Sequence, residues 1–432
     1  MSFPRYPIYK DSGVEWLGEV PAHWDVMPVK NLASIVNGYP FDSTFFDSAE
    51  GYPLIRIRDL NKFEAETYYK GEFVETAAIT SADVLIGMDG DFNVGRWRGQ
   101  GRALLNQRMC CVRGRSNLAT RLLEYSLPIR LKEINDVTYA TTVKHLASSQ
   151  VEKTFVAIPP DTAEQSKIAS FLDRETAKID ELVAEQRRLM ELLKEKRQAV
   201  ISHAVTKGLN PDAPMKPSGI EWMGAVPAHW EVKRISSLST KITNGFVGPT
   251  RDILADSGIR YLQSLHIKGN TIRFEVPYFV AEEWSNQHRK SILETGDVLI
   301  VQTGDIGQTA VVTEEFAGCN CHALIIVAPL RPVVDGEWMS WALNSDYGFH
   351  TLISIQTGAL HPHLNCGNVK DISIPLPSIA EQLRIVEYIK EQIHGFDTLT
   401  AEAQRAIDLL QERRAALISA AVTGSIDIRG FA

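Results

Sequence analysis

One long stretch without glycine or proline constrains this chain more than any other feature. It covers residues 163–206, and its apolar residues recur at alternating three- and four-residue steps. That spacing places side chains on a single face of a helix. At about 1.5 Å per residue such a helix is about 65 Å long, further than one small domain can cover. The helix therefore needs a second helix to bury its apolar stripe.

The far end of the chain supplies that second helix. Residues 380–423 repeat the pattern of residues 163–206 after a shift of 217 positions. Two narrow apolar stripes of equal length are buried best against one another, so we expect the two helices to pair as a coiled coil. The expected seam consists of Ile168, Leu172, Ile179, Leu182, Leu189, Leu193 and Val200 on the first helix, and of Ile385, Ile389, Phe396, Leu399, Leu410 and Leu417 on the second.

The paired helices belong to a wider internal repeat. Residues 12–18 and 20–24 recur as 218–224 and 226–230, residues 83–86 recur as 297–300, and Ile158-Pro159 recurs as Ile374-Pro375 before each long helix. The shift grows from 206 to 217 along the chain, as expected if small insertions accumulated in the loops of a duplicated unit. The chain is therefore interpreted as two copies of one module, each with an N-terminal arm, a mixed domain and a long helix.

Between arm and helix, each copy carries short apolar runs separated by Gly, Asn and Asp. This pattern predicts a mainly β domain with helical insertions. The predicted fold class is α+β, with two mainly β domains and a pair of long helices. The predicted boundaries are 1–160 for the first domain with its arm, 161–208 for the first long helix, 209–378 for the linker, second arm and second domain, 379–424 for the second long helix, and 425–432 for a tail.

Composition limits the cellular setting. A chain of 432 residues is too long for one hydrophobic core. The sequence contains no run of about eighteen apolar residues, so no membrane span is predicted. The polar start of the chain does not fit a signal peptide, so we expect a cytoplasmic protein. Five cysteines without a framework spacing are expected to be reduced thiols. The net charge of −8 argues against a nucleic-acid partner at first, but binding depends on local patches.

The strongest local charge lies in the first copy. Residues 92–123 contain seven arginines and no acid, with glycines, a tryptophan and amides among them. Arginine pairs with phosphate or guanine edges, and Asn or Gln matches adenine edges, so this segment suits duplex DNA. The alternative is a solvated hairpin whose arginines pair with acids on the helices. The candidate DNA contacts are Arg96, Arg98, Gln100, Arg102, Asn106, Gln107 and Arg108.

The second copy has a polar rather than basic counterpart directly after a predicted strand. Its candidates for base contact are Gln302, Thr303, Gln308 and Thr309, although a plain β-turn explains the same residues. Gln263, His266 and Lys268 are further candidates for DNA contact, each equally compatible with an ordinary surface or turn residue.

No catalytic or metal site is expected. The phosphate-loop, nucleophile-elbow and metalloprotease motifs are absent, as is the Asn-Pro-Pro-aromatic motif of adenine methyltransferases. Cysteines and histidines at 319, 321, 322, 361, 363 and 366 invite a zinc interpretation. Their Cys-x-Cys spacing is atypical of structural zinc sites and the first copy has no equivalent set, so buried thiols and loop histidines are the preferred interpretation.

Several of these segments resemble the specificity subunits of type I restriction–modification systems. The resemblance covers essentially the full chain. It is carried by Val-Pro-Ala-His-Trp at 20–24 and 226–230, by the two Ile-Pro pairs, and by Ala-Glu-Gln at 163–165 and 380–382.

That resemblance implies two target recognition domains held apart by an antiparallel pair of long helices, with a pseudo-two-fold axis. Each domain would read part of a split, asymmetric target in double-stranded DNA. Two methyltransferase subunits would carry S-adenosylmethionine, and restriction subunits would use ATP and Mg²⁺, so this chain would bind no cofactor itself and catalyse nothing. The alternatives are a scaffold whose end domains bind protein or another ligand, and a nuclease or methyltransferase with an unrecognised site.

Overall fold

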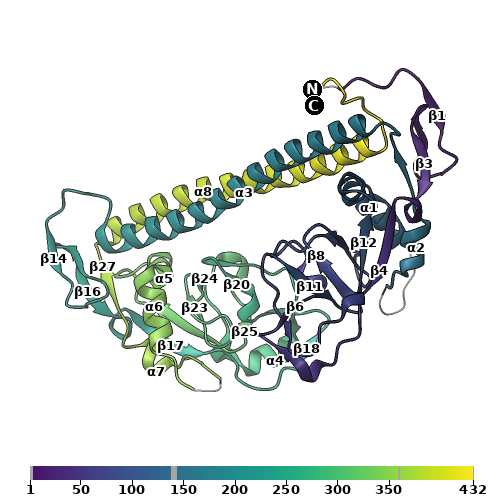
Figure 1. Ribbon diagram of the computed structural model, residues 1–432. Helices are drawn as coiled ribbons and strands as arrows, with labels where there is room; N and C mark the ends of the chain where they lie inside the picture. Colours follow the sequence, from purple (N-terminus) through teal and green to yellow (C-terminus); the bar gives the residue numbers. More distant parts are fainter. Residues whose placement is uncertain (1–2, 138–143, 359–360, 432) are drawn as a thin grey trace. The chain divides into compact units, whose positions relative to one another are not determined.

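The computed structural model describes residues 3–137, 144–358 and 361–431, which form two compact units (Figure 1). The first unit comprises Met1–Gln186 and Arg405–Ala432, and the second comprises Arg187–Gln404. Each unit holds one mixed domain together with part of both long helices. No helix among the described residues is both long enough and apolar enough to cross a lipid bilayer.

The two predicted long helices are α3 (Thr162–Lys207) and α8 (Ile379–Val422). Asp161 caps the start of α3, because its carboxylate accepts a hydrogen bond from the backbone N–H of Ala163 at 3.0 Å. Gly208 and Gly424 follow the two C-termini with φ values of +74° and +71°. Glycine adopts this left-handed conformation without strain, so it ends a helix at a defined residue.

The helices pair antiparallel within each unit, and they lie side by side in Figure 1. In the first unit Asp180 of α3 accepts a hydrogen bond from Arg414 of α8 at 2.8 Å. In the second unit Arg197 of α3 donates to Asp397 of α8. The residue numbers of both pairs add up to 594, so the same antiparallel register holds in both units.

Most of the expected seam lies inside. Ile168, Leu172, Ile179, Leu193, Ile385 and Ile389 are buried, and Val200, Phe396, Leu410 and Leu417 are half-buried. The prediction was wrong for Leu182, Leu189 and Leu399, which are 45%, 41% and 47% exposed. Each comes one residue before the position that faces the partner helix. Val183, for example, is buried beside the exposed Leu182.

Two stacked sheets form the first domain. The first sheet has the order β10-β9-β12-β4, and the second has the order β5-β7-β6-β11-β8. The strands of the first sheet are β4 (Ala33–Asn37), β9 (Val84–Gly87), β10 (Val94–Gly95) and β12 (Met109–Gly114), and those of the second are β5 (Phe46–Asp47), β6 (Tyr52–Ile55), β7 (Tyr68–Tyr69), β8 (Ala78–Thr80) and β11 (Arg102–Leu105). Helices α1 (Asn117–Val137) and α2 (Ser148–Lys153) cover the outer face of the first sheet.

Strand β12 lies at the centre of this domain and is buried on both faces. Cys110 and Val112 point into the core under α1, whereas Met109 and Cys111 point into the core shared with the second sheet. Successive side chains of a strand alternate between faces, so an unbroken apolar run is what a doubly covered strand requires. The cysteines are therefore core residues, and burial raises the pKa of the Cys110 thiol to about 12.

The second domain repeats this architecture. Its first sheet has the order β17-β26-β23-β24 and its second the order β18-β22-β19-β25. These strands are β17 (Ser239–Asn244), β23 (Val298–Val301), β24 (Thr309–Val311) and β26 (Leu324–Pro329), and β18 (Leu254–Ala255), β19 (Ile259–Leu262), β22 (Phe279–Val280) and β25 (Asn320–Cys321). A hairpin and further helices complete it: β20 (Ile267–Lys268), β21 (Thr271–Ile272), α4 (Glu282–Gln287), α5 (Gly336–Asn344), α6 (Asp346–Ser354) and α7 (Cys366–Val369).

A glycine crossing joins the two sheets in both domains. Gly38 follows β4, and a Cβ at this residue would lie 1.8 Å from the carbonyl oxygen of Asn106. Gly245 follows β17, and a Cβ there would lie 2.6 Å from the carbonyl oxygen of Cys321. Only glycine allows two backbones to approach so closely. The shared strand orders and the shared crossing confirm the predicted α+β fold with an internal duplication.

The arms connect each domain to its long helix. A hairpin of β1 (Tyr9–Asp11) and β2 (Glu19–Pro21) leads into β3 (Asp25–Pro28), which pairs with β13 (Phe155–Ile158) just before α3. The second arm has the same order: β14 (Met215–Pro217), β15 (Ala225–Pro227) and β16 (Glu231–Arg234), which pairs with β27 (Ser373–Leu376) just before α8.

Candidate nucleic-acid interface

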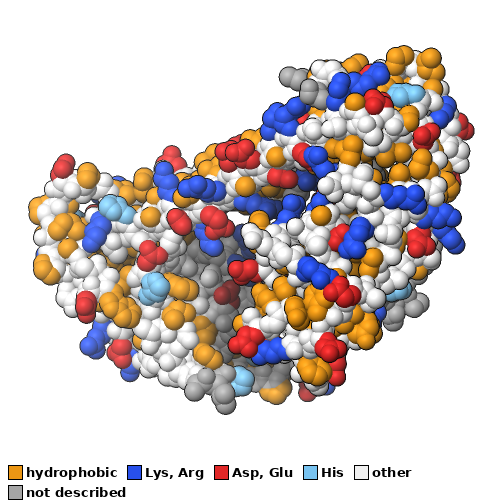
Figure 2. Space-filling model, viewed as in Figure 1, with side chains coloured by type: hydrophobic (Ala, Val, Ile, Leu, Met, Phe, Trp, Pro, Cys, Tyr) orange, Lys and Arg blue, Asp and Glu red, His pale blue; other side chains and the backbone are white. Residues whose placement is uncertain are grey.

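Five of the seven arginines in residues 92–123 form ion pairs with carboxylates. The pairs are Arg96 with Glu124, Arg102 with Glu75, Arg108 with Asp89, Arg113 with Asp83, and Arg121 with Asp173. Of these five carboxylates, only Glu124 and Asp173 lie on α-helices, α1 and α3. On the face shown in Figure 2, basic and acidic side chains are likewise interspersed. Within the described part of the chain, only Arg98 and Arg115 of this cluster are exposed without a carboxylate partner.

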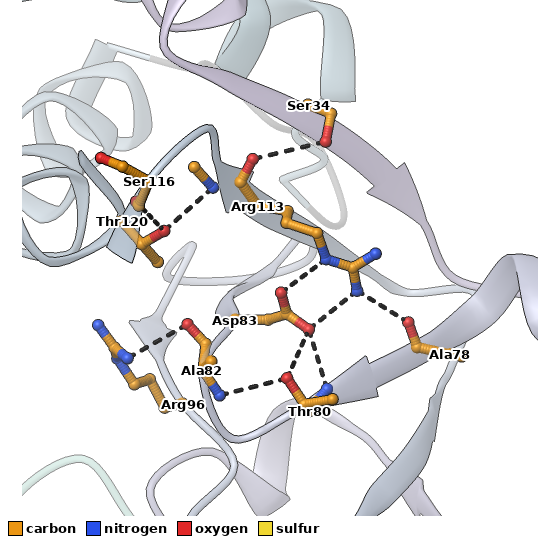
Figure 3. A network of polar contacts seen from close by, with 10 residues as sticks. Ser34, Ala78, Thr80, Ala82, Asp83, Arg96, Arg113, Ser116 and Thr120 are labelled. Carbon is orange, nitrogen blue, oxygen red and sulfur yellow. Dashed lines mark hydrogen bonds and ion pairs between the residues drawn. The ribbon is translucent and has the colours of Figure 1, made fainter. Parts of the chain in front are cut away.

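The pair of Arg113 and Asp83 is part of a network where β12 ends and β9 begins, in the middle of the first sheet (Figure 3). Arg113 donates to both carboxylate oxygens of Asp83, at 2.8 and 2.9 Å, and the backbone N–H of Thr80 donates to the same carboxylate at 2.9 Å. Burial of Asp83 opposes its ionisation, but these hydrogen bonds outweigh burial and lower the pKa of the carboxyl. Arg113 thus supports the fold of the domain.

Asp297 is the repeat equivalent of Asp83 and has the opposite electrostatics. It accepts a hydrogen bond from the backbone N–H of Glu294 at 3.0 Å. No arginine is paired with it among the described residues. Burial therefore dominates and raises the pKa of Asp297.

The remaining candidates of the first domain lie on two neighbouring loops. Arg98 and Gln100 are exposed in residues 96–101, the connection from β10 to β11. Gln107 and Arg108 are exposed in the turn from β11 to β12, where Asn106 is half-buried. The structure thus brings Arg98 and Gln100 to the surface as neighbours, while Arg96 and Arg102 beside them are already neutralised.

Two candidates of the second domain are core residues, so the prediction of DNA contact is corrected for both. Thr309 is fully buried, and its hydroxyl bonds to Ser340 and Asn344. His266 is also fully buried. Its Nδ1 accepts from the backbone N–H of Gln263 at 2.8 Å, so its Nε2 carries the proton that it donates to the carbonyl of Val276 at 2.8 Å. Burial lowers the pKa of this imidazole, which keeps it neutral.

Asp59 of the first domain fills the same structural role as His266. Its carboxylate accepts from the backbone N–H groups of Arg56 and Glu66, at 2.9 and 3.0 Å, and it is fully buried. Both residues end a short 3-10 helix, Ile57–Asp59 in one domain and Ser264–His266 in the other. A sequence comparison that aligned these two turns would have identified His266 as a turn residue.

The other candidates of the second domain lie at or near the surface. Thr303 and Lys268 are exposed, and Gln263 is half-buried. Gln308 accepts a hydrogen bond from the backbone N–H of Gly269 at 3.3 Å. Gln302 is half-buried, and its side-chain oxygen has no hydrogen-bond partner among the described residues.

Strand order corrects the match between the loops of the two copies. Residues 302–308 connect β23 to β24, so their counterpart is the connection of residues 88–93 between β9 and β10. The counterpart of the basic residues 96–101 is the connection from β24 to β25, residues 312–319, which carries Glu314 and Glu315. Equivalent loops of the two domains therefore have opposite charge.

A carboxylate latch, which the sequence did not reveal as such, fixes the first arm to α3. Glu164 in the first turn of α3 accepts hydrogen bonds from Tyr6 at 2.9 Å and from the indole of Trp24 at 3.1 Å. Its second oxygen lies 2.9 Å from Nε2 of His23. The Pro-Ala-His-Trp segment of the arm thus binds the start of α3.

The second arm has a simpler latch. His229 lies 3.0 Å from Glu381 in the first turn of α8. The indole N–H of the buried Trp230 has no partner among the described residues. In the first latch, by contrast, Tyr6 also donates to Glu164, and the guanidinium of Arg429 in the tail lies 4.8 Å from the centre of the Tyr6 ring. The predicted tail is thus part of the first unit.

The exposed leucines of the long helices form two equivalent apolar patches. Leu182 and Leu409 belong to the first unit, and Leu192 and Leu399 belong to the second; their exposures are 45%, 65%, 52% and 47% in that order. Each comes one residue before a seam position. In an antiparallel pair that offset of about 100° turns residues of both helices to the same face. The numbers of each pair add up to 591, so the two leucines lie at nearly the same level.

The cysteines and histidines do not converge. Burial raises the pKa of the Cys319 thiol to about 11, and Cys321 is fully buried. No group of three or more His, Cys, Asp or Glu side chains in the described residues is placed to hold a metal ion.

Comparison with known proteins identifies relatives along nearly the whole chain. The family model described as "Type I restriction modification DNA specificity domain" matches residues 21–190 and 227–408, one match in each copy. The chain is similar to the type I restriction enzyme EcoBI specificity subunit of Escherichia coli, with 28% identity over 96% of this chain and 89% of the relative.

Two further similarities agree in extent. The type I restriction enzyme MjaVIII specificity subunit of Methanocaldococcus jannaschii is 21% identical over 95% of both chains. A solved structure described by the complex assembly and conformational transition of the type I R-M system matches with a TM-score of 0.67 and 16% identity, over 93% of this chain and 98% of that one. At that identity the structural match supports the fold.

Proposed function

Because this chain belongs to the type I restriction–modification DNA specificity family, we propose that it reads a bipartite, asymmetric target in double-stranded DNA, one half-site per domain. It is a specificity subunit, the non-catalytic member of a DNA adenine methyltransferase and endonuclease complex. S-adenosylmethionine, ATP and Mg²⁺ are bound by the partner subunits. The complex works in the cytoplasm, where its DNA lies.

This proposal rests on one contrast: the two domains share their sheets, glycine crossings and connections to the long helices, but their surface loops differ. The order of their shared strands, their glycine crossings and the His–Glu contact of each latch match. Their equivalent loops do not, since residues 96–101 carry arginines where residues 312–319 carry Glu314 and Glu315. Base identity is read by side chains that reach the groove edges. One frame with two different surfaces is therefore suited to reading two different half-sites.

The partner subunits dock on the long helices. The leucine pairs Leu182 with Leu409 and Leu192 with Leu399 offer one equivalent patch in each unit. Exposed apolar patches on a helix pair favour docking of a further apolar surface. Because the patches are equivalent, they suit two copies of the same partner, the methyltransferase subunit. Restriction subunits join the complex thus formed.

Mapping of methylated adenines tests the proposal. The chain is expressed together with methyltransferase subunits of its own type I system in cells that lack other adenine methylation, and the genome is then sequenced for modified bases. The expected result is one asymmetric target with two short specified halves and an unspecified spacer. A single contiguous target, or methylation that does not depend on this chain, would overturn the proposal.

The same mapping, repeated with surface variants of either domain, separates the alternative in which the chain is a scaffold whose end domains bind protein or another ligand. The five acid-paired arginines favour that alternative, because they are not free to contact phosphate. A scaffold would leave the methylation target unchanged when a surface residue of either domain is replaced.

A further inference from the structure

Two loops of the first domain are joined into one rigid surface element, which we call the first-domain tip: residues 61–63 and 96–100. The backbone N–H of Asn61 donates to the carbonyl of Arg96 at 2.7 Å, and the N–H of Arg98 donates to the carbonyl of Lys62 at 2.8 Å. The N–H of Arg96 donates to the side-chain oxygen of Asn61 at 3.2 Å. A tip held in this way loses little conformational entropy when it binds a ligand.

Trp97 decides which side chains the tip presents. Its ring is 2% exposed, and a Cβ at Gly99 would lie 2.3 Å from it and 2.6 Å from the carbonyl oxygen of Phe63. Trp97 and Gly99 therefore face inward. The residues that alternate with them, Arg98 and Gln100, are exposed.

Charge pairing leaves one tip cation available. Arg96 is bound by Glu124, and Lys62 is bound by Glu66. Arg98 has no carboxylate partner in the described residues. The Phe63 ring at the same tip is 76% exposed, the highest exposure of any large hydrophobic side chain described. Within the described residues, the tip thus offers an unpaired guanidinium, an exposed amide and an exposed apolar ring on a backbone held by three hydrogen bonds.

Resting on the proposed function, we propose that Arg98 and Gln100 are specificity-determining residues that read base edges in one half-site. The planar guanidinium of Arg98 pairs with the O6 and N7 acceptors of guanine, and the amide of Gln100 pairs with N6 and N7 of adenine. Phe63 supplies apolar contact to a neighbouring base, such as a thymine methyl group. Arg96, Arg102, Arg108 and Arg113 are paired with carboxylates of the same domain and read no base.

The inference applies to the first domain alone. The equivalent connection in the second domain contains Glu314 and Glu315, and carboxylates repel the DNA backbone. Changes at the tip must therefore alter one half-site and leave the other as it is.

The test uses the reconstituted methyltransferase complex and a DNA library randomised at every specified position. Arg98→Lys keeps the positive charge but removes the fork, and Gln100→Ala removes the amide. Each is expected to lose roughly tenfold or more of the preference at one base pair, at different base pairs of the same half-site. Arg102→Ala is the matched control, because Arg102 is an exposed neighbour that is paired with Glu75. It should leave every base preference intact.

Three outcomes would overturn the inference. The first is an unchanged target in both variants. The second is a uniform loss of binding across all sequences with a smaller salt dependence, which identifies Arg98 as a phosphate contact. The third is failure of Arg98→Lys to assemble, which would show that the side chain has a structural role. A wild-type complex without a bipartite target would instead refute the proposed function, on which the inference about Arg98 and Gln100 rests.

Discussion

Asp180 of α3 accepts a hydrogen bond from Arg414 of α8 at 2.8 Å, and the equivalents of these two residues in the internal repeat also pair with each other. A shift of 217 residues carries Asp180 to Asp397 and Arg197 to Arg414. Arg197 and Asp397 form the same ion pair in the second unit. Exposed ion pairs contribute about 0–1 kcal/mol, so the main effect of these two is to specify the register of the helices.

Deleting residues 184–190 and 401–407 together removes one heptad from each helix at equivalent places and retains both ion pairs. At about 1.5 Å per residue, each helix becomes about 10 Å shorter. With DNA rising about 3.4 Å per base pair, we expect the unspecified spacer to shorten by about three base pairs while both half-sites stay the same. Mapping of methylated adenines measures this. Altered half-sites with an unchanged spacer would contradict the role of the helices as a spacer.

Replacing Leu182 and Leu409 by serine should remove one docking patch. The first-unit patch is then polar, while the pair Leu192 and Leu399 is intact, so we expect the complex to lose one of two methyltransferase subunits. Native mass spectrometry gives the stoichiometry. Leu383→Ser is the control, since Leu383 is 52% exposed but follows the buried Gln382 and so faces the other side. Retention of both subunits by the double variant would exclude this patch.

The two latches should differ in strength. Glu164→Ala leaves the buried donors Tyr6 and Trp24 without an acceptor, which costs about 2–4 kcal/mol of unfolding free energy. Glu381→Ala removes only a contact to the exposed His229 and should cost less than about 1 kcal/mol. Urea unfolding of both variants measures the difference. Equal losses would mean that Tyr6 and Trp24 find other acceptors.

The equivalent carboxylates Asp83 and Asp297 should respond to pH with opposite sign. The native pKa of Asp83 lies below its unfolded value of about 3.8, so its contribution is present at neutral pH and is lost as the pH falls through the native pKa. The native pKa of Asp297 lies above that value. Its favourable contribution is present in acid and is lost as the pH rises through the native pKa.

Asparagine at each position tests this difference. At pH 7, Asp83→Asn should lower the unfolding free energy by about 1–2 kcal/mol, since the ion pair to Arg113 is lost. Asp297→Asn retains an acceptor for the N–H of Glu294 and removes an unfavourable charge, so it should raise the unfolding free energy. Urea midpoints at pH 7 and pH 4 give both values. A loss of stability in both variants at pH 7 would refute the assignment for Asp297.

The long-range organisation of this protein was predictable, and the chemistry of its surfaces was not. Helix periodicity and the repeats identified α3, α8 and two copies of one module. The seam prediction was wrong for Leu182, Leu189 and Leu399. Each lies one residue from a position that faces the partner helix, and the sequence spacing alone does not distinguish these two positions. The arginine cluster misled for another reason. Ion pairs such as Arg113 with Asp83 join residues that are distant in sequence, and no spacing reveals them.

His266 and Thr309 illustrate the same limit. Both are polar residues in turn-rich segments, and only the three-dimensional structure places them in the core with every polar atom satisfied. Both segments of the Glu164 latch, Ala-Glu-Gln and Pro-Ala-His-Trp, were recognised in the sequence as repeated motifs. Because they are about 140 residues apart, only the structure shows that they are in contact.

The crossings at Gly38 and Gly245 carry an evolutionary consequence. Any mutation that adds a side chain at either glycine drives it into a carbonyl oxygen, so neither codon was free to change while the ancestral halves diverged. The loops beyond these crossings were not constrained in this way, and residues 96–101 and 312–319 now have opposite charge. If each domain reads one half-site as proposed, a new target preference can arise in one domain while its sheets and glycine crossing stay the same.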